Sequence, residues 1–135
     1  LGVDIRLAPG ADGPPTARSH VLITADGQRT MQTYLGACTE LGTRHITPAT
    51  FGSPRAVLIE GYVWDLPEGP LLARDAMTLA AANGTAAVLS LSDSFCVERH
   101  RDSFDAAIRD GVEIIVADED EICALTETSS FEAAL

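Results

Sequence analysis

The sequence contains no lysine, and all nine of its basic residues are arginine. Against them stand twenty acidic residues, which gives a formal net charge of −11. The absence of lysine excludes a P-loop lysine and Schiff-base chemistry. The acidic balance argues against broad binding of nucleic acid or anionic lipid. We therefore expect neither nucleic acid nor a membrane as a partner.

Cysteine is also scarce, and long apolar runs are missing. The three cysteines, Cys38, Cys96 and Cys123, are widely spaced and form no C-x-x-C pair, so neither a disulfide framework nor a structural zinc site is indicated. No apolar run reaches the roughly 18 residues of a membrane span, and the N-terminus lacks the basic and apolar pattern of a secretory leader. Reduced thiols in a cytoplasmic protein are the expected state.

The apolar content suffices for one hydrophobic core, since 46% of the 135 residues are hydrophobic.

Charge is uneven along the chain. Residues 1–67 carry six acids and five arginines, a net of −1, whereas residues 68–135 carry fourteen acids and four arginines, a net of −10. An anionic substrate would approach the first half more easily.

A hairpin is predicted in the first part of the chain, residues 1–50. Asp26-Gly27 lies between the strand-like segments 19–24 and 29–35, and Asp-Gly is a strong signal for a two-residue hairpin turn. In the second strand, alternation places Arg29, Met31 and Thr33 on one face. The polarity of both faces suits a flap that has one side toward solvent and the other toward a cleft.

Residues 51–135 alternate between short apolar strands and helices, which predicts βαβ units and a parallel sheet. Ligands bind beyond the carboxyl ends of such strands, so the loops after Ile59, Leu91 and Val116 are of most interest. The last predicted strand, 112–116, is almost wholly apolar and is expected to be buried on both faces. The predicted elements are strands at 56–59, 86–91 and 112–116, and helices from Pro70 to Asn83, from Asp102 or Ser103 to Asp110, at 119–125 and from Ser130.

Two motifs in these loops have a chemical and a structural interpretation. Cys96 and His100 could form a nucleophile and base, but no third orienting residue is evident, which favours a buried cysteine among solvated charges.

The segment Asp118-Glu119-Asp120-Glu121 could hold a divalent cation through oxygen ligands. Asp118 as N-cap with Glu121 three residues later also fits a capping box, and local physics favours this second interpretation.

Three segments together resemble the ribokinase-like (PfkB) carbohydrate kinase family, and most closely its bacterial adenosine kinase branch. They occur in the order and spacing of that family, and the hairpin segment is the most specific. The segments are DGQRTMQTYLGA at 26–37, LIEGYVWD at 58–65 and LSDSFCVERHR at 91–101.

The resemblance implies an α/β, ribokinase-like fold in which residues 1–50 form a small β lid with its connection, and 51–135 a central Rossmann-like segment. It implies an ATP- and Mg²⁺-dependent transfer of a γ-phosphoryl group to a primary hydroxyl of a nucleoside or sugar. Met31 and Thr33 would contact the substrate, and Arg29 would lie near the transferred phosphate. Asp118 and Glu121 stand at the family's Asn-x-x-Glu motif, with Asp118 in place of Asn, and would help organise the magnesium ion.

The family's Gly-rich segment with the catalytic base has no counterpart in this sequence, and its N-terminal substrate-binding glycines and asparagine are missing too. We therefore expect a central fragment of a kinase, with no catalytic residue of its own and no activity alone. The alternative is a non-catalytic module that keeps the lid and sheet to bind a ligand or to form a homodimer through the lid. A third hypothesis is an acidic cation binder built on residues 118–121.

Overall fold

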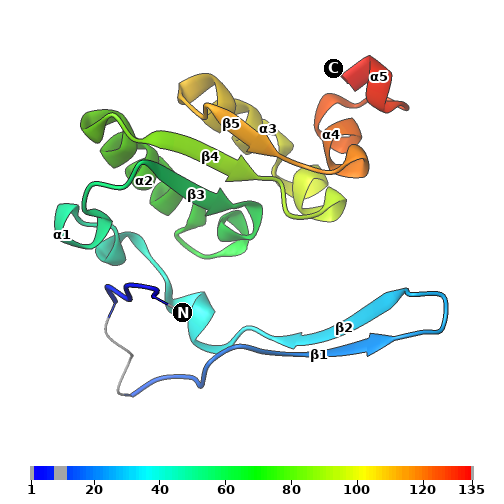
Figure 1. The fold of residues 1–135 in the computed structure, drawn as a ribbon, viewed down its shortest axis with the longest axis horizontal. Helices are drawn as coiled ribbons and strands as arrows, with labels where there is room; N and C mark the ends of the chain where they lie inside the picture. Colours follow the sequence, from blue (N-terminus) through cyan, green and yellow to red (C-terminus); the bar gives the residue numbers. More distant parts are fainter. Residues whose placement is uncertain (1, 8–11, 135) are drawn as a thin grey trace. The chain divides into compact units, whose positions relative to one another are not determined.

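The computed structural model describes residues 2–7 and 12–134 (Figure 1). Their contacts divide the chain into two compact units, Leu1–Leu41 and Gly42–Leu135. Each unit is described by itself below. None of the helices in the described ranges is long and apolar enough to cross a membrane.

The first unit contains the predicted hairpin. Strands β1 (Arg18–Ile23) and β2 (Arg29–Tyr34) pair antiparallel, with Val21 opposite Met31. Gly27 stands in the connecting turn with φ of 83°, a left-handed conformation that favours glycine. A short 3-10 helix, η1 (Gly36–Glu40), follows. All residues of both strands are exposed, so this ribbon has no core of its own.

The second unit is built on a three-stranded parallel sheet in the order β3-β4-β5. Helix α2 connects β3 to β4 and α3 connects β4 to β5, as the alternating sequence pattern predicted (Figure 1). The predicted α/β class, with a hairpin followed by a parallel sheet, is confirmed. The elements are η2 (Thr43–His45), α1 (Pro48–Phe51), β3 (Ala56–Glu60), η3 (Gly61–Asp65), α2 (Gly69–Asn83), β4 (Ala86–Ser90), α3 (Ser94–Asp110), β5 (Ile114–Val116), α4 (Glu119–Thr126) and α5 (Phe131–Ala134).

The core lies between the sheet and helices α2 and α3. Leu89, from the central strand, is fully buried, and Phe104 of α3 meets the ring of Trp64 edge-on at a centroid distance of 4.9 Å. Helix α2 contributes a stripe of small side chains at helical spacing, which lets it pack closely. Burial of this apolar surface supplies most of the driving force for folding the unit. The remaining members of the cluster are Ile59, Ala73, Ala76, Leu91, Cys96, Val97, Ala107 and Leu125.

Helix α3 begins earlier than the sequence analysis predicted. The expected N-cap was Asp102 or Ser103, but the helix spans Ser94–Asp110 and its N-cap is Asp93, whose Oδ1 accepts the N–H of Cys96 at 2.6 Å. The charged residues at 98–102 belong to this helix rather than to a loop, and Glu98, Arg99 and Asp102 are exposed on it. Their density hid the buried stripe that runs through Val97 and Phe104.

Strand β5 is also more exposed than predicted. Burial on both faces was expected, yet Ile114 and Val116 keep 51% and 52% of their surface exposed. Ile114 continues a row across the sheet through Val88 to Leu58, which is 59% exposed. Helices of the described chain cover the opposite face, and this row stays open. An apolar strand of this kind is typical of a sheet that is covered on both faces. The helices of the described residues cover one of these faces.

Candidate functional site

The carboxyl ends of the parallel strands bring several polar side chains together. Glu60 ends β3, Asp93 follows β4, and Asp118 follows β5. Glu121 lies one turn into α4 and is only 9% exposed. Burial raises the pKa of the Glu121 carboxyl, and the negative charges of Asp118, Asp93 and Glu60 raise it further. The edge is therefore a region of concentrated negative charge, where a cation would be attracted.

Asp118 and Glu121 form the capping box that local sequence physics favoured. Asp118 Oδ1 accepts the N–H of Glu121 at 2.8 Å, and Glu121 Oε2 accepts the N–H of Asp118 at 3.0 Å. These bonds use one oxygen of each carboxylate. The two carboxylates are thus held in a fixed arrangement at the edge, a donor set of hard oxygens that suits Mg²⁺. Capping and cation binding are compatible here.

A second group of contacts ties the loop after β3 to the loop after β4. The Tyr62 hydroxyl donates to Asp93 Oδ2 at 2.6 Å. This bond, with burial and the negative charge of Asp93, raises the pKa of Tyr62 to about 12. Ser92 has a φ of 75°, which is unusual for a residue other than glycine, and its Oγ lies 3.4 Å from Glu60 Oε2.

Gly61 is explained by packing against β4. A Cβ atom at this position would lie 2.7 Å from the carbonyl oxygen of Leu91, closer than real Cβ contacts. The sequence analysis placed the loop after Ile59 among three at the edge of the sheet where ligands bind. The structure accounts for the glycine through the close approach of two strand ends.

The Cys96 and His100 pair does not have the geometry of a nucleophile and base. Cys96 is fully buried, and burial together with the negative charge of Asp65 raises its thiol pKa to about 11. His100 directs its Nε2 atom to Asp65, which belongs to η3. Sequence reasoning missed Asp65 as the partner because it lies 35 residues away and no local spacing signals the contact.

The hairpin residues lie on the first unit. Met31 is 61% exposed, and Thr33 Oγ1 is 2.9 Å from Ser19 Oγ across the ribbon. The register places Arg29, Met31 and Thr33 on the same face, as predicted. The roles of these three residues, and of Asp118 and Glu121, remain predictions.

Solved structures provide the comparison with known proteins. A probable sugar kinase from Rhizobium etli matches with 40% identity and a TM-score of 0.86, over 94% of this chain and 39% of its own. The adenosine kinase from Sinorhizobium meliloti matches with 43% identity and a TM-score of 0.84, over 91% and 38%. An Anopheles gambiae adenosine kinase, solved with P1,P4-di(adenosine-5) tetraphosphate, shares the fold at 21% identity and a TM-score of 0.72, over 84% and 34%.

No protein-family profile matches the chain, and neither does any curated protein. The chain spans less than two fifths of the length of the solved proteins that it resembles. Over that span, both the sequence identity and the backbone geometry indicate the same relationship. Over the segment that it covers, the chain therefore has the ribokinase-like fold of these sugar and adenosine kinases.

Proposed function

We propose that the chain supplies the lid and the central sheet of an ATP-dependent kinase acting on the primary hydroxyl of a nucleoside or sugar. The observation that carries the proposal is the identity of 40% and 43% to a sugar kinase and an adenosine kinase over more than nine tenths of the chain. The rigid carboxylate pair at the carboxyl edge adds chemical support, because phosphoryl transfer needs a site for Mg²⁺.

Each site residue takes a role that its chemistry permits. The Arg29 guanidinium would pair with the transferred phosphate through charge-assisted hydrogen bonds. Met31 and Thr33, on the same face of the hairpin, would contact the substrate. Asp118 and Glu121 would hold Mg²⁺, which neutralises phosphate charge when bound. The charge of Asp118, where the family has Asn, strengthens the attraction for the cation. We place this kinase in the cytoplasm, where its ATP would be available.

A chimera tests the proposal most directly. Residues 2–134 would replace the matching segment of the Sinorhizobium meliloti adenosine kinase, which supplies the parts that this chain does not span. ATP-dependent phosphorylation is then measured with adenosine and with a panel of sugars. We expect a folded, active chimera and no turnover by the chain alone. A chimera that folds cooperatively and turns over no substrate would contradict the proposal.

Two pairs of variants in the chimera separate the predicted roles from general effects. Arg29→Gln should lower kcat about 100-fold or more, as loss of a group that stabilises transition-state charge does. Arg18→Gln is the control, since Arg18 lies on the opposite face of the same hairpin. Glu121→Gln should raise the Mg²⁺ concentration needed for half-maximal activity. Glu119→Gln, an exposed change in the same helical turn, should leave it unchanged.

The second candidate is a non-catalytic module that binds nucleoside or forms a homodimer through the lid. The observation that favours it is the exposed apolar pair Val21 and Met31 at the centre of one hairpin face, on a ribbon whose outer edges can accept another strand. Sedimentation of the chain should then give a dimer, and Met31→Glu a monomer. A monomeric chain that binds no nucleoside would exclude this module.

A further inference from the structure

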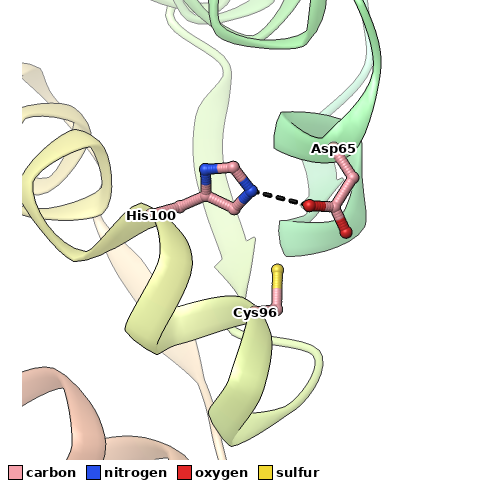
Figure 2. A group of neighbouring side chains, drawn as sticks. All are labelled: Asp65, Cys96 and His100. Atoms are coloured by element: carbon pink, nitrogen blue, oxygen red, sulfur yellow. Dashed lines mark hydrogen bonds and ion pairs between the residues drawn. The ribbon is translucent and has the colours of Figure 1, made fainter.

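Three side chains that could act as metal ligands meet at the end of η3. Figure 2 shows Cys96 and His100 projecting from successive turns of α3 toward Asp65. His100 Nε2 lies 2.7 Å from Asp65 Oδ1, and the potential ligand atoms of all three residues lie within 4.8 Å of one another. Cys96 and His100 are four residues apart, so a helix places both on one face.

The three side chains converge on one point, and the imidazole does not bridge the sulfur and the carboxylate. The imidazole nitrogen that is bonded to Asp65 faces the other two groups, and the second ring nitrogen is turned away from both (Figure 2). A nucleophile and base would instead need one ring nitrogen at the sulfur and the other at the carboxylate. Convergence of sulfur, imidazole and carboxylate is what a metal ion requires.

The burial of the cluster is graded. Cys96 is fully buried, while the side chains of His100 and Asp65 keep 21% and 37% of their surface exposed. The sulfur therefore forms the floor of the cluster, and the imidazole and carboxylate form its rim. An ion could enter from the solvent side and keep a water molecule as a fourth ligand.

We propose that Asp65, Cys96 and His100 form a three-ligand site for a thiophilic divalent metal ion, of which Zn²⁺ fits best. Zinc binds cysteine sulfur at about 2.3 Å and histidine nitrogen and carboxylate oxygen at about 2.0–2.2 Å in tetrahedral geometry. Ligand atoms in such a site are roughly 3.3–3.8 Å apart. The ion would take the place of the bond between His100 and Asp65 and draw the sulfur closer. The thiol loses its proton on binding.

The absence of a C-x-x-C pair from the sequence does not oppose this site, because two ligands come from α3 and the third from the distant η3. The ligand set also separates it from the carboxylate pair at the sheet edge. Mg²⁺ prefers oxygen ligands, whereas sulfur and imidazole select metals such as zinc. A bound ion would link η3 to α3 and fix the loop that follows β3.

Arg99 provides the most informative perturbation. Its Nη2 lies 2.8 Å from Asp65 Oδ2 and its Nε lies 3.2 Å from Oδ1, so its positive charge competes with a cation for the same carboxylate. Removing one unit charge roughly 6 Å from a divalent ion should raise the metal affinity about tenfold in water at low salt. A merely structural cluster would gain no metal affinity from this change.

The experiment is a titration of the chelator-treated 135-residue chain with Co²⁺, a spectroscopic substitute for zinc, followed by competition with Zn²⁺. We expect one cobalt per chain, a near-ultraviolet thiolate charge-transfer band and strong visible bands typical of a tetrahedral site. Cys96→Ser should abolish the charge-transfer band and His100→Ala should weaken the visible bands. Cys123→Ser, a change in a thiol outside the cluster, should leave both unchanged. Excess Zn²⁺ should displace the cobalt.

Three results would overturn the proposal. The first is a parent chain with no charge-transfer band, and the second is a band that persists in Cys96→Ser. The third is an affinity that is unchanged or lowered in Arg99→Gln. This last variant alters a half-exposed side chain and decides the question even where Cys96→Ser fails to fold.

Discussion

The replacement Asp93→Ala should loosen the connection between the loops that follow β3 and β4. Asp93 serves two partners: its Oδ1 caps α3 by accepting the N–H of Cys96, and its Oδ2 accepts the Tyr62 hydroxyl. Alanine removes both bonds at once. The change therefore tests whether the carboxyl edge is held by the side chains that the structure places there.

The expected cost follows from the two bonds. Loss of an N-cap side chain typically costs about 1 kcal/mol of stability. The Tyr62 bond contributes roughly another 1 kcal/mol, because Tyr62 is 47% exposed and solvent screens the charge of Asp93. We expect Asp93→Ala to lower the free energy of unfolding by about 2 kcal/mol. Asp93→Asn keeps an oxygen at the cap position and should lose about half as much.

The ionisation of Tyr62 gives an independent readout. Asp93 stabilises the protonated hydroxyl and helps to raise the pKa of Tyr62 from 10.0 to about 12. This contribution to stability is fully present below about pH 10 and is lost as the pH rises through about 12. In Asp93→Ala the pKa should move back toward 10. Ultraviolet titration in a Tyr34→Phe background isolates the signal of Tyr62.

Urea unfolding followed by circular dichroism measures the stability change. A free energy of unfolding that is the same in the parent and in Asp93→Ala would refute the assignment of the cap. An unchanged pKa of Tyr62 would refute the contact between the two loops. Equal losses in Asp93→Ala and Asp93→Asn would show that charge, rather than the acceptor atom, dominates.

Three further predictions follow from burial. Since burial raises the pKa of Glu121, its folded form binds a proton more readily, and stability should fall as pH rises from the ordinary pKa of a glutamate through the raised one. Glu121→Gln keeps an acceptor for Asp118 and should remove that slope in urea unfolding followed over a series of pH values above the ordinary pKa of a glutamate. Phe104→Ala should cost about 3–5 kcal/mol in the same assay, and a cost below about 1 kcal/mol would contradict its place in the core. A thiol reagent should modify the exposed Cys38 quickly and spare Cys96 until the chain unfolds, and equal rates would contradict the burial of Cys96.

The sequence predicted the elements whose signals are local. Asp26-Gly27 specifies a tight turn, and Gly84, in a left-handed conformation with φ of 62°, ends α2 where Asn83-Gly84 indicated. The alternation of short apolar strands with helices predicted the parallel sheet, because such strands need a crossover between them. The capping box of Asp118 and Glu121 was readable from four adjacent residues.

Only the tertiary structure decided the exposure of β5 and the partner of His100. The Asp93 cap of α3 is a local signal, and it was missed because the charges that follow it suggested a loop. The apolar pattern of β5 could not say whether both of its faces are covered. Asp65 meets His100 across 35 residues of chain. A turn or a helix cap is determined by neighbouring residues, so the local sequence predicts it. Contacts between distant segments depend on how the sheet and helices pack, which short-range patterns in the sequence do not encode.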